Sequence, residues 1–431
     1  MSSELRALWE QAGGQVPDHW SVVTLESLLR DSKSIAVGVM YPGPHTDGGV
    51  PLIKVGDISG GALRKRPEYC ISSETNHEYR RTQLDGDELL ITLVGNPGEC
   101  VVVTGAMRGW NPARAIAVVR FRDSSLRTYI KAVLESSAGK HLIDAVLNTT
   151  VQKTLNLKDV RQLPIPMPSR REIDEISTVS NALTERITLL RETNATLEAI
   201  AQALFKSWFV DFDPVRAKSR GLAPAGMDEV TASMFPDGFE ESVVGLVPRG
   251  WPVKTLQDLL VLQRGFDLPS QDRVPGDFPI IAASGRSGTH TEAMAKGPGV
   301  VTGRSGVLGR VFLELDDHWP LNTTLWVKEF RAATACYAYE VLRLLDFKAF
   351  NAGSAVPTLN RNHIHSLPYV IPPIDCVKAY EVIAIRLHQR ARLNAKQAET
   401  LGTLRDTLLP RLISGQLRLP EVEAQISEAT T

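Results

Sequence analysis

The side chains that could do chemistry are few, and their spacing fits no known reaction. Asn96-Pro97 and Asn111-Pro112 begin like the active site of an amino-methyltransferase, but neither is followed by the second proline and the aromatic residue of that motif. Residues 137–141 resemble the end of a phosphate-binding loop, yet the position that requires glycine holds leucine and no hydroxyl residue follows the lysine. We therefore predict that the chain has no catalytic site.

The potential metal ligands are equally sparse. His363 and His365 lie in a polar turn and could bind a metal, but no third ligand is evident, and a solvated pair is the commoner reading. The cysteines have no paired spacing, which fits a reducing compartment and argues against structural zinc; they are Cys70, Cys100, Cys336 and Cys376. We predict no metal site.

Side chains that read DNA bases recur in both halves of the chain. Arginine can bond guanine in bidentate fashion, asparagine can do the same for adenine, and serine bonds phosphate or either base. The candidates in the first half are Arg64, Lys65, Arg66, Arg80, Arg81, Asn96, Arg108, Asn111 and Arg114. Those in the second half are Arg264, Ser284, Arg286, Ser287, Arg304, Ser305, Arg310 and Asn322. A single such residue is usually just solvated, so the hypothesis depends on finding two equivalent sets.

The net charge limits how such residues could act. With 48 basic and 49 acidic side chains the formal charge is −1, and residues 166–246 carry 8 basic against 13 acidic groups. A self-sufficient DNA-binding domain is strongly basic. We expect the positive charge to be confined to one face or to be supplied by a partner, because phosphate contacts give most of the salt-dependent affinity.

A long amphipathic segment, residues 169–213, must position these candidates. Its seam positions, most of them apolar, follow an unbroken alternation of three and four, which predicts one helix of roughly forty residues, about 60 Å long, with a narrow packing seam. Ser169 and Glu172 form a predicted capping box, and Pro214 is the predicted end. The seam positions are Ile173, Ile176, Ser180, Leu183, Ile187, Leu190, Asn194, Leu197, Ala201, Leu204 and Trp208.

A second copy of this segment lies 204 residues later, closed by Pro410 and Gly415. Its seam reads Val377, Tyr380, Ala384, Leu387, Ala391, Asn394, Ala398, Leu401, Arg405, Leu408 and Leu412. Flanking segments repeat as well. VPDHWSVVTLESLL at 16–29 matches VPRGWPVKTLQDLL at 247–260. Further matches join Thr154-Leu155-Asn156 to Thr358-Leu359-Asn360, Gly95 and Gly98 to Gly306 and Gly309, and Asn111 to Asn322. The chain is an internal duplication of a domain and a helix.

The predicted fold is α+β, with two repeated globular domains separated by two long antiparallel helices and related by an approximate two-fold axis. Short strands are predicted near 50–58, 86–103 and 115–121, with one helix over 125–147 and another over 333–347. The boundaries are 1–168 for the first domain, 169–213 for the first helix, 214–246 for a linker, 247–373 for the second domain, 374–415 for the second helix and 416–431 for a tail. The chain has neither a long apolar run nor a signal pattern, so we expect a cytoplasmic protein with no membrane segment.

The central region resembles that of the specificity subunit of type I restriction-modification enzymes. FVDFDPVRAKSRG from Phe209, MDEVTASMFPDGFEESVVGLVPRGW up to Trp251, and LLPRLISGQLRLP from Leu408 carry this resemblance, and it extends along the whole chain. It implies two target-recognition domains that each read one part of a bipartite, asymmetric site in double-stranded DNA. It also implies that the helices bind two methyltransferase subunits and that a motor-nuclease restriction subunit joins them. The subunit would bind no cofactor, because S-adenosylmethionine, ATP and magnesium are used by the partners.

Particular residues follow from this hypothesis. Antiparallel helices would fix the distance between the two domains, so that helix length predicts the spacer in the DNA site, and Asn194 would set the helix register. The partner-binding residues that we predict are Phe205, Trp208, Phe209, Phe212, Leu408 and Leu412. A protein-protein scaffold and a self-contained DNA-modifying enzyme remain the alternatives.

Overall fold

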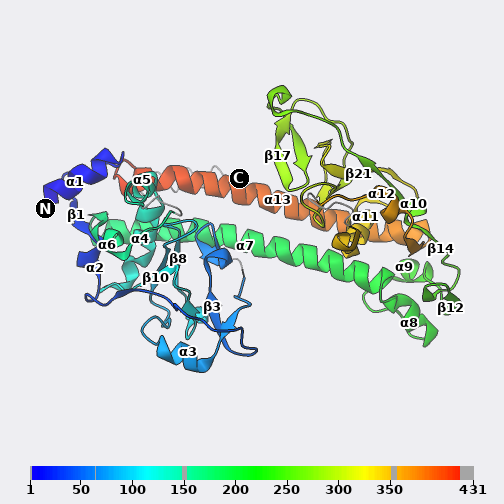
Figure 1. Cartoon of the computed structure of the whole chain (residues 1–431), viewed down its shortest axis with the longest axis horizontal. Coiled ribbons are helices and arrows are strands. Elements are labelled where there is room, and N and C mark those ends of the chain that lie inside the picture. The colour runs from blue at the N-terminus through cyan, green and yellow to red at the C-terminus, as the bar shows by residue number, and fades with distance from the viewer. Residues whose placement is uncertain (1, 64, 148–152, 351–356, 418–431) are drawn as a thin grey trace. The chain divides into compact units, whose positions relative to one another are not determined.

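The computed structural model describes residues 2–63, 65–147, 153–350 and 357–417 (Figure 1). The chain divides into two compact units. Unit 1 comprises Met1–Arg191 and Lys396–Thr431, and unit 2 comprises Glu192–Ala395. Each unit therefore contains one globular domain together with part of each long helix. None of the helices that the structure describes combines the length and the apolar composition needed to cross a bilayer.

The domain of unit 1 is built around a four-stranded antiparallel sheet. The strand order is β2 (Ile35–Val37), β10 (Ile116–Val119), β7 (Leu89–Thr92) and β8 (Cys100–Val102). In a second sheet, β3 (Val50–Ile53) pairs antiparallel with β6 (Cys70–Ile71) and parallel with β9 (Asn111–Pro112). Two further antiparallel pairs join β1 (Ser21–Thr24) to β11 (Pro164–Met167) and β4 (Ile58–Ser59) to β5 (Ala62–Leu63). All residues of β7 and β10 are buried, because different core clusters cover the two faces of the main sheet.

Short helices surround these sheets. They are α1 (Ser2–Gln11), α2 (Leu25–Leu28), α3 (Ser73–Glu78), α4 (Arg127–Glu135), α5 (Ser137–Ala145) and α6 (Leu157–Gln162), with 3-10 turns at Val55–Asp57, Gly105–Met107 and Ser124–Leu126. The single helix predicted over 125–147 is thus two helices. Ser136 has extended backbone angles, and its hydroxyl accepts the N–H of Gly139 at 3.1 Å, so a new helix is capped there. The phosphate-loop-like residues 137–141 are simply the start of this helix.

The domain of unit 2 repeats this arrangement. Its main sheet has the order β15 (Leu260–Arg264), β21 (Thr324–Phe330), β18 (Gly299–Gly303) and β19 (Val311–Glu314), all antiparallel. In its second sheet, β16 (Phe278–Ala282) pairs antiparallel with β17 (Gly285–His290) and parallel with β20 (Trp319–Pro320). β14 (Val253–Thr255) pairs with β22 (Pro368–Val370). The helices are α10 (Leu256–Leu259), α11 (Ala335–Leu344) and α12 (Arg361–His365), with 3-10 turns at Ser270–Asp272 and Phe347–Phe350.

The two domains therefore have the same strand connectivity, as the duplicated sequence predicts. The matched glycines occupy corresponding hairpins: Gly95 and Gly98 have φ of 84° and 90°, and Gly306 and Gly309 have 86° and 85°. Such left-handed angles favour glycine, which explains why these positions stand out in a single sequence. The spatial two-fold relation between the domains stays a prediction.

The two long helices are α7 (Arg170–Phe209) and α13 (Ile374–Ile413) (Figure 1). Ser169 and Glu172 form the predicted capping box: the N–H of Ser169 donates to the Glu172 carboxylate at 2.8 Å, and its hydroxyl accepts the N–H of Glu172 at 3.4 Å. Within unit 2 the helices are antiparallel, since Asn194 contacts Ala391 while Ala201 contacts Tyr380. Most seam residues are buried, and positions near the middle of each helix are partly exposed.

Both predicted proline terminators are wrong. α7 ends before Pro214, because Phe212 adopts a left-handed conformation (φ 56°) and Pro214 then starts the short helix α8 (Asp213–Ser219). α13 continues through Pro410 to Ile413. Gly415, with φ of 68°, is where the chain turns away.

Residues 214–246, predicted as a surface linker, are partly folded into unit 2. Besides α8 they form α9 (Glu229–Ser233) and most of a hairpin of β12 (Phe239–Ser242) and β13 (Gly245–Pro248). Val215 and Phe235 are fully buried in the core of this unit. The segment was predicted to be a linker because it is rich in Pro, Gly and acidic residues, and its few buried apolar residues were not recognised.

Candidate nucleic-acid interface

In unit 1 a close backbone crossing brings separate loops together. After β2 the chain runs beside the end of β9, where Val39 forms a parallel bridge with Ala113. A Cβ on Gly38 would lie 2.0 Å from the carbonyl oxygen of Pro112, so only glycine permits this approach. The N–H of Arg114 donates to the Val39 carbonyl at 2.9 Å. Arg114 therefore lies beside the loop that begins at Met40.

Asn111, predicted to read bases, is instead a buried structural residue. It is fully inaccessible, and its Nδ2 donates to Asn76 Oδ1 at 3.0 Å and to the Tyr79 carbonyl at 3.2 Å. Its Oδ1 accepts the hydroxyl of Thr82 at 2.8 Å. A buried amide needs such partners, and these use both its donor and its acceptor. The prediction for Asn111 is thus wrong, and its role is to hold the turn after α3 against β9.

This turn carries Arg80 and Arg81. Arg80 and Arg114 are exposed and make no side-chain hydrogen bond or ion pair with the residues that the structure describes. Arg81 donates to the Lys33 carbonyl at 2.8 Å, which leaves its charge at the surface. The structure therefore brings Arg80 and Arg114 to the same end of the domain, linked through the Asn111 network.

The other first-half candidates lie elsewhere or are engaged. Arg64 lies outside the described residues. The rest have local partners: Lys65 pairs with Glu68, Arg66 lies over the ring of Trp110, Arg108 donates to the Asp85 carbonyl, and Asn96 donates to Glu99.

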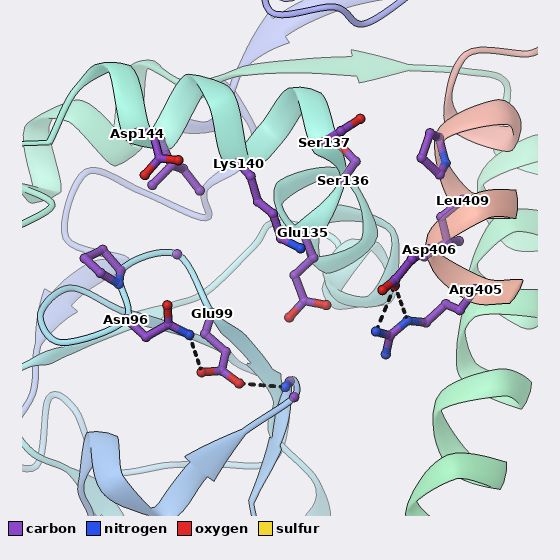
Figure 2. A pocket seen from close by; sticks show the side chains of 16 residues that line it. Asn96, Glu99, Glu135, Ser136, Ser137, Lys140, Asp144, Arg405, Asp406 and Leu409 are labelled. Atoms are coloured by element: carbon purple, nitrogen blue, oxygen red, sulfur yellow. Dashed lines mark hydrogen bonds and ion pairs between the residues drawn. The ribbon is translucent and has the colours of Figure 1, made fainter. Parts of the chain in front are cut away.

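Asn96 borders a cavity of about 540 Å³ within unit 1 (Figure 2). The walls come from the β7–β8 loop, from residues 135–144 and from residues 405–410 of α13. Four carboxylates but only two cations, Lys140 and Arg405, line it, and Arg405 contacts neighbouring Asp406 at 2.9 Å. A negatively charged wall disfavours a nucleic-acid backbone. This cavity is therefore a poor place for the DNA contact predicted for Asn96.

Unit 2 has the same backbone crossing with different side chains. A Cβ on Gly265 would lie 2.2 Å from the Leu321 carbonyl oxygen, and Phe266 bridges Leu321 as Val39 bridges Ala113. Beyond the crossing, the Asn322 amide and the Arg264 guanidinium both contact the carboxylate of Asp267. These three polar side chains form one linked group at the surface.

The strand registers correct one sequence match. Leu52 pairs with Asn111 in unit 1, whereas Ile280 pairs with Trp319 in unit 2. Asn111 thus corresponds to Trp319, and Asn322 corresponds to Arg114. The segment that joins the hairpin to this strand differs in length between the two units. The match of Asn111 with Asn322 at a spacing of 211 is therefore a coincidence.

Of the remaining second-half candidates, Arg304, Ser305 and Arg310 belong to the β18–β19 loop. The N–H groups of Arg304 and Ser305 both donate to the Thr323 carbonyl, next to Asn322. Arg310 donates to the Ser284 carbonyl at 2.6 Å. Arg286 pairs with the buried carboxylate of Glu314 at 2.6 Å, and Ser287 accepts from Arg273, so these two are tied to the protein.

Sequence reasoning missed three residues at these crossings: Met40, Tyr41 and Asp267. The signal that could have found them is Gly38 and Gly265, which directly follow β2 and β15, the first strands of the two main sheets. Neither glycine has a positive φ, so no turn motif marked them. Glycine is required at these two positions only because a backbone segment distant in sequence approaches closely there.

Possible metal ligands are used by the protein itself. In the described part of the chain one group of three acidic residues comes close together, Asp85, Asp87 and Glu88. The Glu88 carboxylate accepts three backbone N–H groups and pairs with Arg120 at 2.8 Å. His365 is buried rather than solvated, and its Nε2 accepts the N–H of Leu262 at 2.9 Å. Burial lowers the pKa of His365, which favours this neutral acceptor.

The residues predicted to bind partners are mostly buried inside their own unit. Phe205, Trp208 and Phe209 pack against Tyr337 and against Tyr380 of α13 in the core of unit 2. Leu408 and Leu412 are buried in unit 1, and only Phe212 is partly exposed. The predicted methyltransferase contact is wrong for the buried five, because the domains themselves cover this aromatic and leucine surface.

Comparison with known proteins finds relatives along most of the chain, although no protein-family model matches it. The type I restriction enzyme MjaIX specificity subunit of Methanocaldococcus jannaschii is 21% identical over 328 residues, which cover 70% of this chain and 71% of that protein. The EcoBI specificity subunit of Escherichia coli is 25% identical over 237 residues, 52% of this chain and 50% of that one. The HindI specificity subunit of Haemophilus influenzae is 25% identical over 357 residues, 67% and 74% of the two chains.

A solved structure has the same fold. The S subunit of the type I restriction-modification system from M. genitalium superposes with a TM-score of 0.56 at 16% identity, over 92% of this chain and 97% of that one. The three curated relatives are each named as a specificity subunit of a type I restriction enzyme. The chain is thus a homologue of type I restriction enzyme specificity subunits, as the resemblance in its sequence predicted.

Proposed function

We propose that this chain is the DNA sequence-specificity subunit of a type I restriction-modification complex and that each globular domain reads one part of a bipartite site. The observation that supports this most directly is the repeated crossing at Gly38 and Gly265. It presents polar side chains, exposed Arg114 and partly exposed Asn322, at corresponding places in two domains of the same connectivity. Because those side chains differ, Arg114 in one domain and Asn322 in the other, the two parts of the site differ in sequence.

The partners supply what this chain lacks. We propose that two methyltransferase subunits and a motor-nuclease subunit assemble with it, and that they use S-adenosylmethionine, ATP and magnesium while this subunit binds no cofactor. The formal charge of −1 favours shared affinity, since counterion release needs many cationic contacts with phosphates. DNA binding by the free subunit is therefore weak, and binding by the assembled complex is tighter.

The exposed faces of the long helices are the proposed docking surface for methyltransferase. On α13, Val382 and Leu393 are 54% and 60% exposed. They are eleven residues apart, which places them on the same side of the helix three turns from each other. Exposed Arg386 and Gln389 lie between them on that side. Large apolar side chains exposed on one face of a helix are a feature of surfaces that another protein covers.

The test of the proposed function is the methylation pattern that the subunit imposes. The chain is expressed with the methyltransferase gene of its own host, and methylated adenines are mapped in a DNA library. The expected result is methylation at a two-part site that changes when the residues of one domain change. Methylation at unrelated sequences, or an identical pattern with a different specificity subunit, would overturn the proposal.

A further inference from the structure

Unit 1 exposes an aromatic side chain on an anchored loop. Tyr41 follows the Gly38 crossing and is 76% exposed, and its neighbour Met40 is 39% exposed. Isolated apolar side chains are common on protein surfaces, so exposure alone implies nothing. The distinctive feature is that the loop around this tyrosine is held in place by several contacts.

Four contacts fix the loop. The Tyr41 N–H donates to the hydroxyl of Tyr79 at 3.4 Å, and the Tyr69 hydroxyl donates to the Gly43 carbonyl at 2.5 Å. The Cys70 N–H donates to Nδ1 of His45 at 3.1 Å, and the Cys70 carbonyl accepts the N–H of Thr46 at 3.0 Å. A loop restrained in this way loses little conformational freedom when it binds a partner.

The surroundings of Tyr41 carry positive charge. Tyr79, which contacts its backbone, is followed by Arg80, and Arg114 lies across the bridge between Val39 and Ala113. Both arginines are exposed and, within the described residues, have no side-chain partner. An exposed aromatic group whose loop adjoins two such cations suits a polyanion with flat, partly apolar bases.

We propose that Tyr41, with Arg80 and Arg114 on the adjoining segments, is a specificity-determining contact through which unit 1 reads its part of the DNA target. This inference rests on the proposed function and adds a base-reading residue to it. The ring contacts a base edge or a thymine methyl group, and the hydroxyl hydrogen-bonds a base edge or a phosphate. The arginines bind phosphate or guanine. Asn111 acts as a positioning residue, because its amide ties the turn that carries Arg80 to β9.

Unit 2 places other chemistry at the corresponding positions. Strand register aligns Met40 with Asp267 and Tyr41 with Leu268, which is only partly exposed. The second domain therefore has no aromatic group at this point. Replacing Tyr41 is expected to affect one part of the bipartite site and to leave the other unchanged.

The experiment uses the complex of this subunit with its methyltransferase. The wild-type target is first identified by mapping methylated adenines. Fluorescence anisotropy then measures binding to the target duplex and to duplexes changed in either part, for wild type, Tyr41→Ala, Tyr41→Phe and Arg114→Ala. Arg122→Ala is the matched control, since Arg122 is an exposed arginine beyond the opposite end of β10. Thermal unfolding and size exclusion verify folding and assembly of each variant.

The expected result is that Tyr41→Ala weakens target binding about tenfold and relaxes discrimination in one part of the site only. Arg114→Ala is expected to weaken binding, and Arg122→Ala to leave it unchanged. A sequence-specific wild-type complex whose Tyr41→Ala variant keeps its affinity and discrimination would overturn this inference while the proposed function stands. A wild-type complex without sequence preference would overturn both. Loss of methyltransferase assembly in Tyr41→Ala would show that the loop binds protein instead, and would also overturn it.

Discussion

The side-chain amide of Asn394 donates to Oδ1 of Asn194 at 2.9 Å, and Asn194 donates in turn to the Ala391 carbonyl at 2.8 Å. The two asparagines thus form a hydrogen-bonded pair between α7 and α13 within unit 2. Asn394 is buried and Asn194 is partly buried. A polar pair in an apolar seam favours the one alignment in which both amides are satisfied. This supports the register role predicted for Asn194 and identifies its partner.

Replacing Asn394 by alanine is expected to destabilise unit 2 by about 1–3 kcal/mol, because Oδ1 of Asn194 loses its donor. The double change of Asn194 and Asn394 to leucine is expected to recover that stability, since neither amide then remains. Urea denaturation measures both, with Gln389→Ala as the exposed control on the same helix. If the single and double variants lost equal stability, the pair would not act as a unit.

Asn111 and Asn96 make a second contrast. Asn111→Ala removes a buried amide with three partners and is expected to cost about 1–3 kcal/mol of unfolding free energy. Asn96→Ala removes one exposed contact with Glu99 and is expected to change stability by less than about 0.5 kcal/mol. Thermal unfolding distinguishes them. Equal melting temperatures for the two variants would contradict the structural role assigned to Asn111.

Glu340 predicts how unit 2 responds to pH. Burial raises the pKa of this carboxyl from 4.5 to about 7, although nearby Arg343 opposes the shift. The folded protein therefore keeps a proton that the unfolded chain releases near pH 4.5. Its contribution to stability is highest below that pH, falls as the pH rises to about 7, and is constant above it.

Between pH 5 and pH 8 this group is expected to lower the unfolding free energy of the wild type by roughly 2–3 kcal/mol. Glu340→Gln is expected to lack this loss, because glutamine does not titrate. Denaturant unfolding between pH 4 and 8 measures the effect, and Glu329→Gln, an exposed carboxylate in the same unit, is the control. If the unfolding free energy of the wild type did not fall with pH relative to that of Glu340→Gln, the raised pKa assigned to Glu340 would be contradicted.

The sequence alone predicts those features that depend on local chemistry or on a repeat. The capping box of Ser169 and Glu172 needs only a four-residue pattern, and the two helix seams need only periodicity. The hairpin glycines are repeated in both copies because the positive φ of these turns favours glycine. Two copies in one chain also allowed the domains to be recognised without an alignment.

Features that depend on distant contacts could not be predicted in this way. Asn111 looks like a base reader, and only the fold shows that Asn76, Tyr79 and Thr82 surround it. The aromatic residues Trp208 and Phe209 look too large for two helices, and the domain of unit 2 proves to cover them. Pro410 is tolerated inside the last turn of α13, although proline usually ends a helix.

The final prediction concerns the outer face of α13. Val382→Asp together with Leu393→Asp is expected to abolish stable assembly with methyltransferase, because two charges would replace the two apolar side chains of the proposed contact. Both side chains are exposed in the free subunit, so the folded state should lose less than about 1 kcal/mol. Size exclusion with multi-angle light scattering measures the stoichiometry. Val243→Asp, at a hairpin tip where the side chain is 92% exposed, is the control and is expected to assemble normally. A double variant that still binds two methyltransferase copies would place the docking surface elsewhere.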